Sequence, residues 1–443
     1  MLITRLEGGA GILALRGAMA LDPQCYRLTI ITGQVTGRLL SEARAAGLTI
    51  AVEPALRTPI DPVCDIVALR RLAIQLRRGR FDVVHTHTAK AGTLGRLAAR
   101  RAAVPRIVHT YHGFPFHEFQ PAARRAAYIA IERRLGRITD LALCVGTGVA
   151  VEAVRRGLVS PERIRTIGVA VEGFGQPGAE HAGLTAAPAA GKAAANNPAA
   201  DGWTAADLPA DYLAAREQAR RELGIPAGAT VIGAVGRLTY QKAPEDFVDV
   251  IRRLSRPGVV GVWVGDGELA GQVSQLAAAD PAVRVILAGD RADVPRLLPA
   301  FDVFVMPSRY EGLPTAIVEA MMCGVPVVAT AVNAVADVVV PGETGLLVPP
   351  RRPDLMAGAV GYLLNSPAAA ARMATRAQAQ LGERYGIAAL RAALTAAYQP
   401  DLLGIVNKSK LSPFFIIPVL RTAPWDVYMV RRGGLKDDSG VFG

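Results

Sequence analysis

Short runs of β-branched and aliphatic residues alternate along most of this chain with longer stretches rich in Ala, Leu and Arg. The first series of such runs comprises residues 27–32, 48–53, 81–86, 106–111 and 141–145. The second series comprises residues 230–236, 259–265, 283–289, 301–307 and 325–330. Apolar runs of this length between helical stretches are typical of parallel strands that helices cover on both faces. The pattern therefore predicts an α/β fold with two parallel sheets.

The length of 443 residues fits two domains of ordinary size together with extra segments. We expect the domains over residues 1–174 and 213–381, joined by an Ala/Pro/Gly-rich linker or insertion over 175–212. One more helix is expected over 382–398. Periodicity is lost in residues 399–443, which we expect to be an appended tail of unknown structure.

The composition indicates the cellular compartment of the protein and its possible contact with a membrane. Its four cysteines form no CxxC pair, which favours a reduced, cytoplasmic protein. No run reaches the roughly 18 uninterrupted apolar residues of a membrane span. Residues 1–150 hold about twice as many Lys and Arg as Asp and Glu, which suits either an anionic membrane surface or an ordinary Arg-rich solvated surface. No nucleic-acid motif accompanies the charge. We therefore expect a cytoplasmic protein that could bind peripherally to the inner face of the plasma membrane.

The pattern with the most chemical content is SRYEGLPTAIVEAMMCGVPVVAT at residues 308–330. Pro314 is a residue typical of helix starts, so Glu311 is expected in the loop before the helix and Glu319 in its second turn. The backbone amides of Gly312 and Leu313 then lie near a helix N-terminus, which favours an anion. Without the surrounding pattern, the two carboxylates are more readily explained as an exposed helix residue and a helix-start charge.

A second pattern, AVGRLTYQKAPEDFV at residues 234–248, places two cations after a strand. Ligands bind at the carboxyl ends of parallel strands, and cations there neutralise a departing diphosphate. Arg237 and Lys242 are therefore candidate phosphate ligands, with ordinary loop charges as the alternative.

Histidines follow two strands of the first series. His85 and His87 share one face of a strand end, which could suggest metal ligands, but no further ligand stands at a fitting spacing. His112 follows the run 106–111, and His109 is an alternative to it within the same run. A lone His at a strand end is more often structural than catalytic.

The glycine-rich loop at residues 7–14 formally fits the dinucleotide pattern GxGxxA. A dinucleotide site needs an acidic residue after the second strand, but Gly33 and Gln34 stand there, so this interpretation fails. The strand before the loop looks truncated, and we expect it to form a shortened edge of the first sheet.

Together these stretches resemble glycosyltransferase family 4. The motifs that carry the resemblance are GRLTYQK, VGDGE, LAGDRADV, the block at 308–330 and PGETGLLVPP, with HTHTAKAGTLGRLAAR and VHTYHGF in the first half. The resemblance implies a GT-B fold, in which two Rossmann-like domains face each other across a cleft. It also implies retaining, metal-independent transfer from a nucleotide-sugar, with no cofactor. The chain contains no D-x-D metal signature.

The resemblance assigns roles to matching residues. Arg237 and Lys242 match the pair that clamps the nucleotide diphosphate, and Glu319 matches the carboxylate that binds the ribose. Glu311 and His112 match the residues that meet the donor sugar, so we expect them to be catalytic. The match also implies that Gly8 and Gly9 let the backbone approach the donor phosphates or the acceptor, and that Asp290 lies near the nucleobase. The helix N-terminus adds Gly312 and Leu313 to the expected donor-binding residues.

The expected reaction moves a sugar from a nucleoside diphosphate-sugar, with UDP favoured, to a hydroxyl of a glycan or lipid-linked acceptor in cell-envelope or exopolysaccharide synthesis. Two other functions stay open. One is an isomerase of the same fold, similar to the UDP-N-acetylglucosamine 2-epimerases. The other is a non-catalytic scaffold, which the short start and the unusual tail make conceivable.

Overall fold

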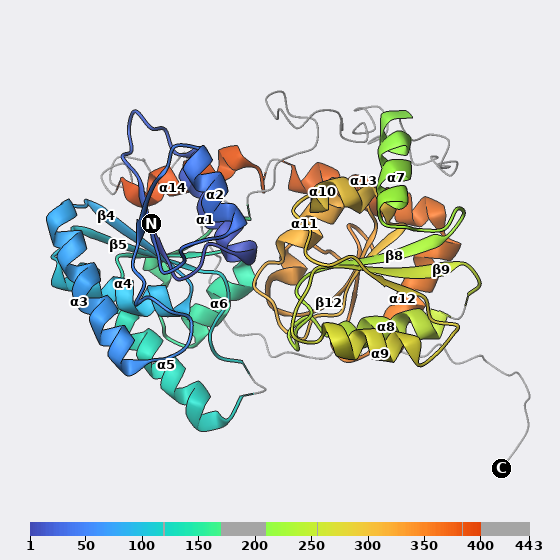
Figure 1. The fold of residues 1–443 in the computed structure, drawn as a ribbon, viewed down its shortest axis with the longest axis horizontal. Coiled ribbons are helices and arrows are strands. Elements are labelled where there is room, and N and C mark those ends of the chain that lie inside the picture. Colours follow the sequence, from blue (N-terminus) through green and yellow to red (C-terminus); the bar gives the residue numbers. More distant parts are fainter. Residues whose placement is uncertain (118–119, 170–209, 255, 383, 400–443) are drawn as a thin grey trace, which may run out of the picture.

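The computed structural model describes residues 1–117, 120–169, 210–254, 256–382 and 384–399 (Figure 1). Most of the expected linker and nearly all of the expected tail lie outside these residues. Helix α7 begins at Ala210, so residues 210–212 of the expected linker are helical.

The first domain is built on a seven-stranded parallel sheet in the order β3-β2-β1-β4-β5-β6-β7. Its strands are β1 (Leu2–Ile3), β2 (Thr29–Thr32), β3 (Thr49–Val52), β4 (Val83–His87), β5 (Arg106–Tyr111), β6 (Leu141–Cys144) and β7 (Ile164–Thr166). Its helices are α1 (Gly8–Ala20), α2 (Arg38–Ala45), α3 (Pro62–Gly79), α4 (Ala89–Arg101), α5 (Ala122–Gly136) and α6 (Thr147–Arg155), with the short helix η1 (Pro161–Arg163). Helices α3, α4 and α5 cover one face of this sheet, and α1 and α2 cover the other (Figure 1).

The second domain is built on a six-stranded parallel sheet in the order β10-β9-β8-β11-β12-β13. Its strands are β8 (Thr230–Val235), β9 (Val259–Val264), β10 (Val285–Leu287), β11 (Val303–Met306), β12 (Val327–Thr330) and β13 (Leu346–Val348). Its helices are α7 (Ala210–Glu222), α8 (Pro244–Leu254), α9 (Ala270–Ala278), α10 (Val294–Leu297), α11 (Thr315–Met322), α12 (Pro353–Asn365) and α13 (Pro367–Leu381), with the short helices η4 (Leu298–Ala300) and η5 (Asn333–Asp337). The predicted α/β class with two parallel sheets is confirmed.

Burial explains why the strands could be recognised as apolar runs. All six residues of β9 and all four of β11 are buried, because helices pack on both faces of the sheet. Trp263 of β9 packs edge-on against Phe247 of α8, and its indole N–H donates to the carbonyl oxygen of Gly236 at 2.7 Å. That bond fixes the backbone where β8 ends, which is the edge that ligands use in parallel sheets.

The first strand is short but central. β1 pairs in parallel with β2 on one side and β4 on the other, with Leu2 opposite Thr86 and Ile3 opposite His87. The expectation of a shortened sheet edge is therefore wrong. The strand order reverses between β1 and β4, and a crevice for ligands opens at such a reversal.

The last described helix, α14 (Ile387–Tyr398), returns the chain to the first domain, where it packs against α1 (Figure 1). It begins five residues later than the 382–398 expected from the sequence, because α13 extends to Leu381 and a turn follows it. The hydroxyl of Tyr398 lies 2.6 Å from Nδ1 of His85, and Nε of Arg106 donates to the carbonyl oxygen of Ala397 at 2.6 Å. These contacts fasten α14 to β4 and β5.

The two domains also touch at the start of α6. Gly146, before that helix, has no side chain to cap it, and the carboxylate of Asp337 in η5 accepts a hydrogen bond from the backbone N–H of Thr147. A Cβ on Gly148 would lie 2.7 Å from the carbonyl oxygen of Asn333. The second domain therefore caps a helix of the first.

Candidate active site

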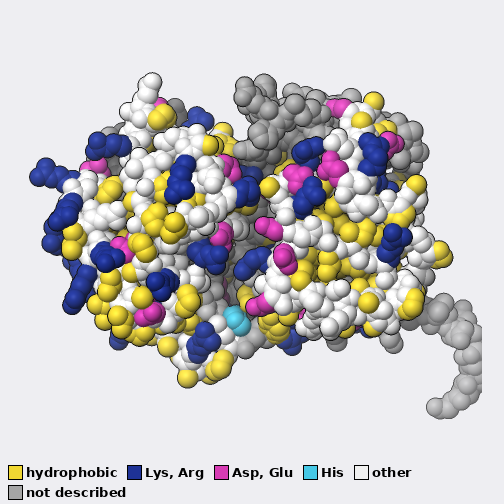
Figure 2. All heavy atoms as spheres, in the orientation of Figure 1, with side chains coloured by type: hydrophobic (Ala, Val, Ile, Leu, Met, Phe, Trp, Pro, Cys, Tyr) yellow, Lys and Arg dark blue, Asp and Glu magenta, His cyan; other side chains and the backbone are white. Residues whose placement is uncertain are grey.

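A cavity of 2410 Å³ lies between the two domains. It opens at the furrow that separates the two lobes in Figure 2, where acidic and basic side chains stand on both rims. All ten residues that the sequence analysis assigned to the site line this cavity: Gly8, Gly9, His112, Arg237, Lys242, Asp290, Glu311, Gly312, Leu313 and Glu319. The structure thus brings together residues that stand far apart in the chain.

Glu311 lies in the loop between β11 and α11, where three side chains hold it. Nζ of Lys242 is 2.5 Å from its Oε1, and Nε2 of Gln241 donates to its Oε2 at 3.3 Å. The backbone N–H of Glu311 donates to Oδ1 of Asn333 at 3.0 Å. The side chain of Glu311 is only 5% exposed, so these partners fix its position at the cavity wall.

Glu319 stands in the second turn of α11, as expected, and is buried. Nη2 of Arg16, in α1 of the first domain, lies 3.7 Å from its Oε1. An ion pair therefore bridges the two domains at the cavity. Arg16 lies seven residues after Gly9 and so on the same face of α1, yet nothing in the sequence pairs it with Glu319.

Two helix N-termini meet across the cavity. α1 starts at Gly8, which has φ +59°, and α11 starts after Pro314. The first backbone N–H groups of any α-helix lack intrahelical partners, and neither of these two helices has a side-chain cap to bond them. A Cβ on Gly9 would stand 3.3 Å from Oγ1 of Thr315, which shows how close the two helices come. Unpaired N–H groups and two helix dipoles at one cavity favour an anionic ligand.

Gly312, which follows Glu311, allows the two domains to approach each other closely. A Cβ on Gly312 would lie 1.7 Å from the carbonyl oxygen of His112, a distance that no side chain can occupy. The loop before α11 therefore packs directly on the turn that follows β5. Gly312 therefore has two roles: it makes this close contact between the domains possible, and it lies just before the N-terminus of α11.

His112 lines the cavity, and burial lowers its pKa to about 4. Its Nε2 lies 3.0 Å from Nδ1 of His87. His109 is buried beneath α4 with its Nδ1 2.8 Å from Oγ1 of Thr86, and it does not line the cavity. The structure therefore brings His112, and not His109, to the cavity.

The possible metal ligands are explained by packing. The rings of His85 and His87 lie on one face, as expected, with centroids 4.2 Å apart. Within the residues that the structure describes, no group of three or more His, Cys, Asp or Glu side chains could hold a metal ion. Metal-independent chemistry stays a prediction.

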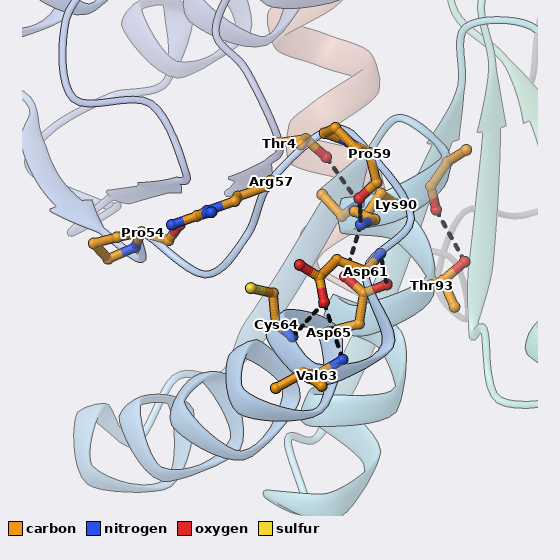
Figure 3. A network of polar contacts seen from close by, with 12 residues as sticks. Thr4, Pro54, Arg57, Pro59, Asp61, Val63, Cys64, Asp65, Lys90 and Thr93 are labelled. Carbon is orange, nitrogen blue, oxygen red and sulfur yellow. Dashed lines mark hydrogen bonds and ion pairs between the residues drawn. The ribbon is translucent and has the colours of Figure 1, made fainter.

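A network on the first domain shapes the far wall of the cavity (Figure 3). Nζ of Lys90, at the start of α4, donates to Oδ1 of Asp65 at 2.7 Å and to the carbonyl oxygen of Pro59. These bonds hold the segment that carries Thr58 and Ile60 against the cavity. No sequence pattern indicates this network, because Lys90 and Asp65 meet only after α3 and α4 have packed together.

Comparisons with known proteins agree on one family. The model of "Glycosyltransferase Family 4" matches residues 7–172, and that of "Glycosyl transferases group 1" matches residues 215–380. A relative in Escherichia coli, "UDP-Gal:alpha-D-GlcNAc-diphosphoundecaprenol alpha-1,3-galactosyltransferase", is 32% identical over 63% of this chain and 65% of its own length. The "D-inositol 3-phosphate glycosyltransferase" of Mycobacterium marinum is 29% identical over 72% of this chain and 64% of its own length. The chain thus spans somewhat less than two thirds of these two relatives.

Solved structures match the fold over nearly its whole length. Anabaena Alr3699/HepE in complex with UDP and glucose superposes with a TM-score of 0.70 at 19% identity, covering 91% of this chain and 99% of that one. WaaG, described as a glycosyltransferase involved in lipopolysaccharide biosynthesis, superposes with a TM-score of 0.62 at 14% identity, covering 90% and 98%. With two facing parallel sheets and both domain models matched in order, the chain belongs to glycosyltransferase family 4 and has the GT-B fold.

Proposed function

We propose that this protein transfers a sugar from a nucleoside diphosphate-sugar to a hydroxyl of an acceptor, with retention at the anomeric carbon. The observation that carries the proposal is the convergence of two cations, two carboxylates and two uncapped helix N-termini on one cavity. Cations and free N–H groups suit a diphosphate, and carboxylates suit sugar and ribose hydroxyls. UDP is the favoured nucleotide, because a relative's name specifies UDP-Gal and a solved neighbour holds UDP.

In this proposal Arg237 and Lys242 bind the diphosphate and stabilise the charge that grows on it as the sugar leaves. Glu319 binds the ribose and Glu311 the donor sugar, while Asp290 lies near the nucleobase. The acceptor hydroxyl attacks from the face that the diphosphate leaves, and a phosphate oxygen takes its proton. The bond from the anomeric carbon to the phosphate oxygen breaks as the bond to the acceptor oxygen forms. The contact between Gly312 and His112 closes the two domains and limits water, which would otherwise hydrolyse the donor.

The test uses the full chain with UDP-, GDP- and ADP-sugars. A ligand that binds the folded state raises the melting temperature, so a thermal-shift screen identifies the nucleotide. Product analysis with and without acceptor then separates the functions: a new glycoside supports transfer, and an epimerised donor without acceptor supports the isomerase. Absence of binding to every nucleotide in isothermal titration supports the scaffold.

Replacing Glu319 by alanine is expected to weaken donor binding more than turnover. A buried carboxylate that accepts hydrogen bonds from ribose hydroxyls contributes about 1.5–3 kcal/mol, so the Kd for the nucleotide rises about 10- to 100-fold. Titration calorimetry with UDP measures this change. Glu343→Ala, at an exposed turn of the same domain, is the matched control and leaves Kd unchanged. Equal Kd values for the two variants would remove Glu319 from the donor site.

The acceptor side of the proposal is a glycan or lipid-linked acceptor at an anionic membrane surface, in cell-envelope or exopolysaccharide synthesis. The outer face of α3 supports this proposal, because Val63, Ile66 and Ile74 on it are 72%, 53% and 49% exposed. Two exposed arginines accompany them: Arg70 lies between Ile66 and Ile74, and Arg77 lies one turn after Ile74. Basic side chains cluster along this rim of the first domain (Figure 2). No described helix is long and apolar enough to cross a bilayer. Such a face can lie on a membrane without entering it deeply.

Sedimentation with vesicles tests this surface. Each basic side chain near an anionic bilayer contributes about 1 kcal/mol, so Arg70→Glu with Arg77→Glu is expected to weaken binding to phosphatidylserine vesicles at least about tenfold at low salt. High salt should likewise weaken the binding of the unmodified protein to these vesicles, because salt screens exposed charges. Arg352→Glu, on the second domain, serves as the control. Full activity on a soluble acceptor without any vesicle binding in low salt contradicts the membrane proposal.

A further inference from the structure

His87 is a buried side chain to which the proposed function assigns no role. It ends β4, is 3% exposed, and places its Nδ1 3.0 Å from Nε2 of His112. Its own Nε2 is buried and contacts no hydrogen-bonding group among the described residues. The ring of His85 packs against it with centroids 4.2 Å apart and uses both of its own nitrogens elsewhere, on Tyr398 and Thr110. His87 is therefore held in place and has one hydrogen-bond partner, His112.

Both rings of the pair are neutral at ordinary pH. Burial lowers the pKa of His112 to about 4 and that of His87 well below its usual value, and the neighbouring His85 and His112 lower the pKa of His87 further. A hydrogen bond between two neutral imidazoles contains one proton, so one ring donates and the other accepts. Two arrangements of protons are possible, and they differ in what they leave unpaired.

In the first arrangement His112 donates from Nε2, and the proton of His87 must then sit on Nε2. That places an N–H group in a buried site without an acceptor. In the second arrangement His87 donates from Nδ1, and the buried Nε2 of His87 keeps a bare lone pair. The Nδ1–H of His112 then belongs to a residue that lines the cavity, where water can accept from it. Buried donors without acceptors are rarer in proteins than under-used acceptors, because the lost N–H bond to water is not replaced. The second arrangement is therefore the more stable.

We propose that His87 is a positioning residue that fixes the tautomer of His112, so that His112 presents a neutral Nδ1–H donor to the cavity. Nδ1 is the ring nitrogen that the contact with His87 leaves available, and His112 lines the cavity. His112 then donates a hydrogen bond to an oxygen of the donor sugar and does not act as a base. This inference rests on the proposed function for its chemical meaning, but the tautomer is a property of the free protein.

The direct test is nitrogen NMR of the full chain labelled at histidine. The chain has only six histidines, so the His112→Ala spectrum identifies the resonances of His112. The expected result is a protonated Nδ1 and a bare Nε2 for His112, and a protonated Nδ1 for His87. A proton on Nε2 of His112 overturns the proposal. The spectrum is recorded without substrate, so it tests the tautomer of His112 independently of any activity. Failure to detect sugar transfer would contradict the proposed function but would leave the result on the tautomer unchanged.

Two variants of His87 test the effect on turnover. His87→Asn keeps an N–H donor near the position of Nδ1, and His87→Leu removes it. We expect kcat of the leucine variant to fall about 10- to 100-fold, the usual effect of losing one well-placed hydrogen bond to a reacting group, with an unchanged Kd for UDP. The asparagine variant should retain most of kcat, and the leucine substitution should add little to His112→Ala because the two residues act as a unit. Equal losses in the asparagine and leucine variants, with UDP binding intact, would contradict the proposal. If His87→Leu does not fold, the spectrum of the unmodified protein decides.

Discussion

Replacement of Lys242 by alanine is expected to lower kcat/KM for the nucleotide-sugar about 100- to 1000-fold, the usual effect of removing one group that stabilises developing charge. Lys242 is mostly buried and makes its ion pair with Glu311, so it is fixed at the cavity before any donor enters. In the proposed donor complex, the same ammonium neutralises both the carboxylate of Glu311 and the diphosphate. Its loss removes stabilisation of the leaving group and leaves Glu311 without its cation. Steady-state kinetics with the donor identified by thermal shift measures the effect.

Arg352→Ala is the matched control for this substitution. Arg352 also forms an ion pair of 2.5 Å, with Asp354, but both side chains are about half exposed and lie away from the cavity. Exposed pairs contribute about 0–1 kcal/mol, so neither activity nor stability should change much. Lysine to arginine at 242 keeps the charge, so it should recover part of the lost activity. Normal kinetics of the Lys242→Ala variant would show that Lys242 does not take part in the reaction.

The second large effect concerns stability. Glu132→Gln is expected to lower the free energy of unfolding of the first domain by about 3–5 kcal/mol, because it leaves a buried arginine without its counter-charge. Arg96 is fully buried, and its Nη2 contacts both carboxylate oxygens of Glu132, at 2.8 and 3.1 Å. The hydroxyl of Tyr111 donates to the same carboxylate at 3.1 Å, and burial together with the charge of Glu132 raises the pKa of Tyr111. Denaturant titration followed by circular dichroism measures the change.

An exposed pair of the same domain provides the comparison. Arg38 and Glu42 lie 3.4 Å apart on α2 with side chains 55% and 48% exposed, so Glu42→Gln should cost less than about 0.5 kcal/mol. Replacing both buried partners together, as Arg96→Met with Glu132→Leu, should restore most of the stability, since no buried charge is left unpaired. If Glu132→Gln is no more destabilising than Glu42→Gln, the buried pair does not support the domain.

The sheets could be predicted because their strands are buried on both faces, so that apolar runs such as 259–265 stand out from the helices around them. The site residues of the second domain could be located because they follow strands whose ends share one edge of the sheet. The central position of β1 could not be predicted, because it depends on pairing with strands that are distant in sequence. The contacts of Arg16 with Glu319 and of His87 with His112 depend on how close whole elements pack, which no local pattern specifies.

Burial also decided between alternatives that the sequence left open. His109 and His112 are three residues apart, and only the path of the chain after β5 determines which of them reaches the cavity. Asn333, which holds the loop of Glu311, has a left-handed backbone with φ +45° in a short helix that no motif announces. Such supporting residues were missed because their role is visible only once their partner is in place.

The hydrogen bond from Thr147 to Asp337 links the contact between the two domains to the stability of a helix. The first turn of α6 has its cap only while the domains are together, so separation exposes those amides to water. A lost cap costs about 0.5–2 kcal/mol, which shifts an open–closed balance roughly two- to thirtyfold toward closed. Separation of the two lobes is therefore coupled to the loss of one helix cap, at the start of α6.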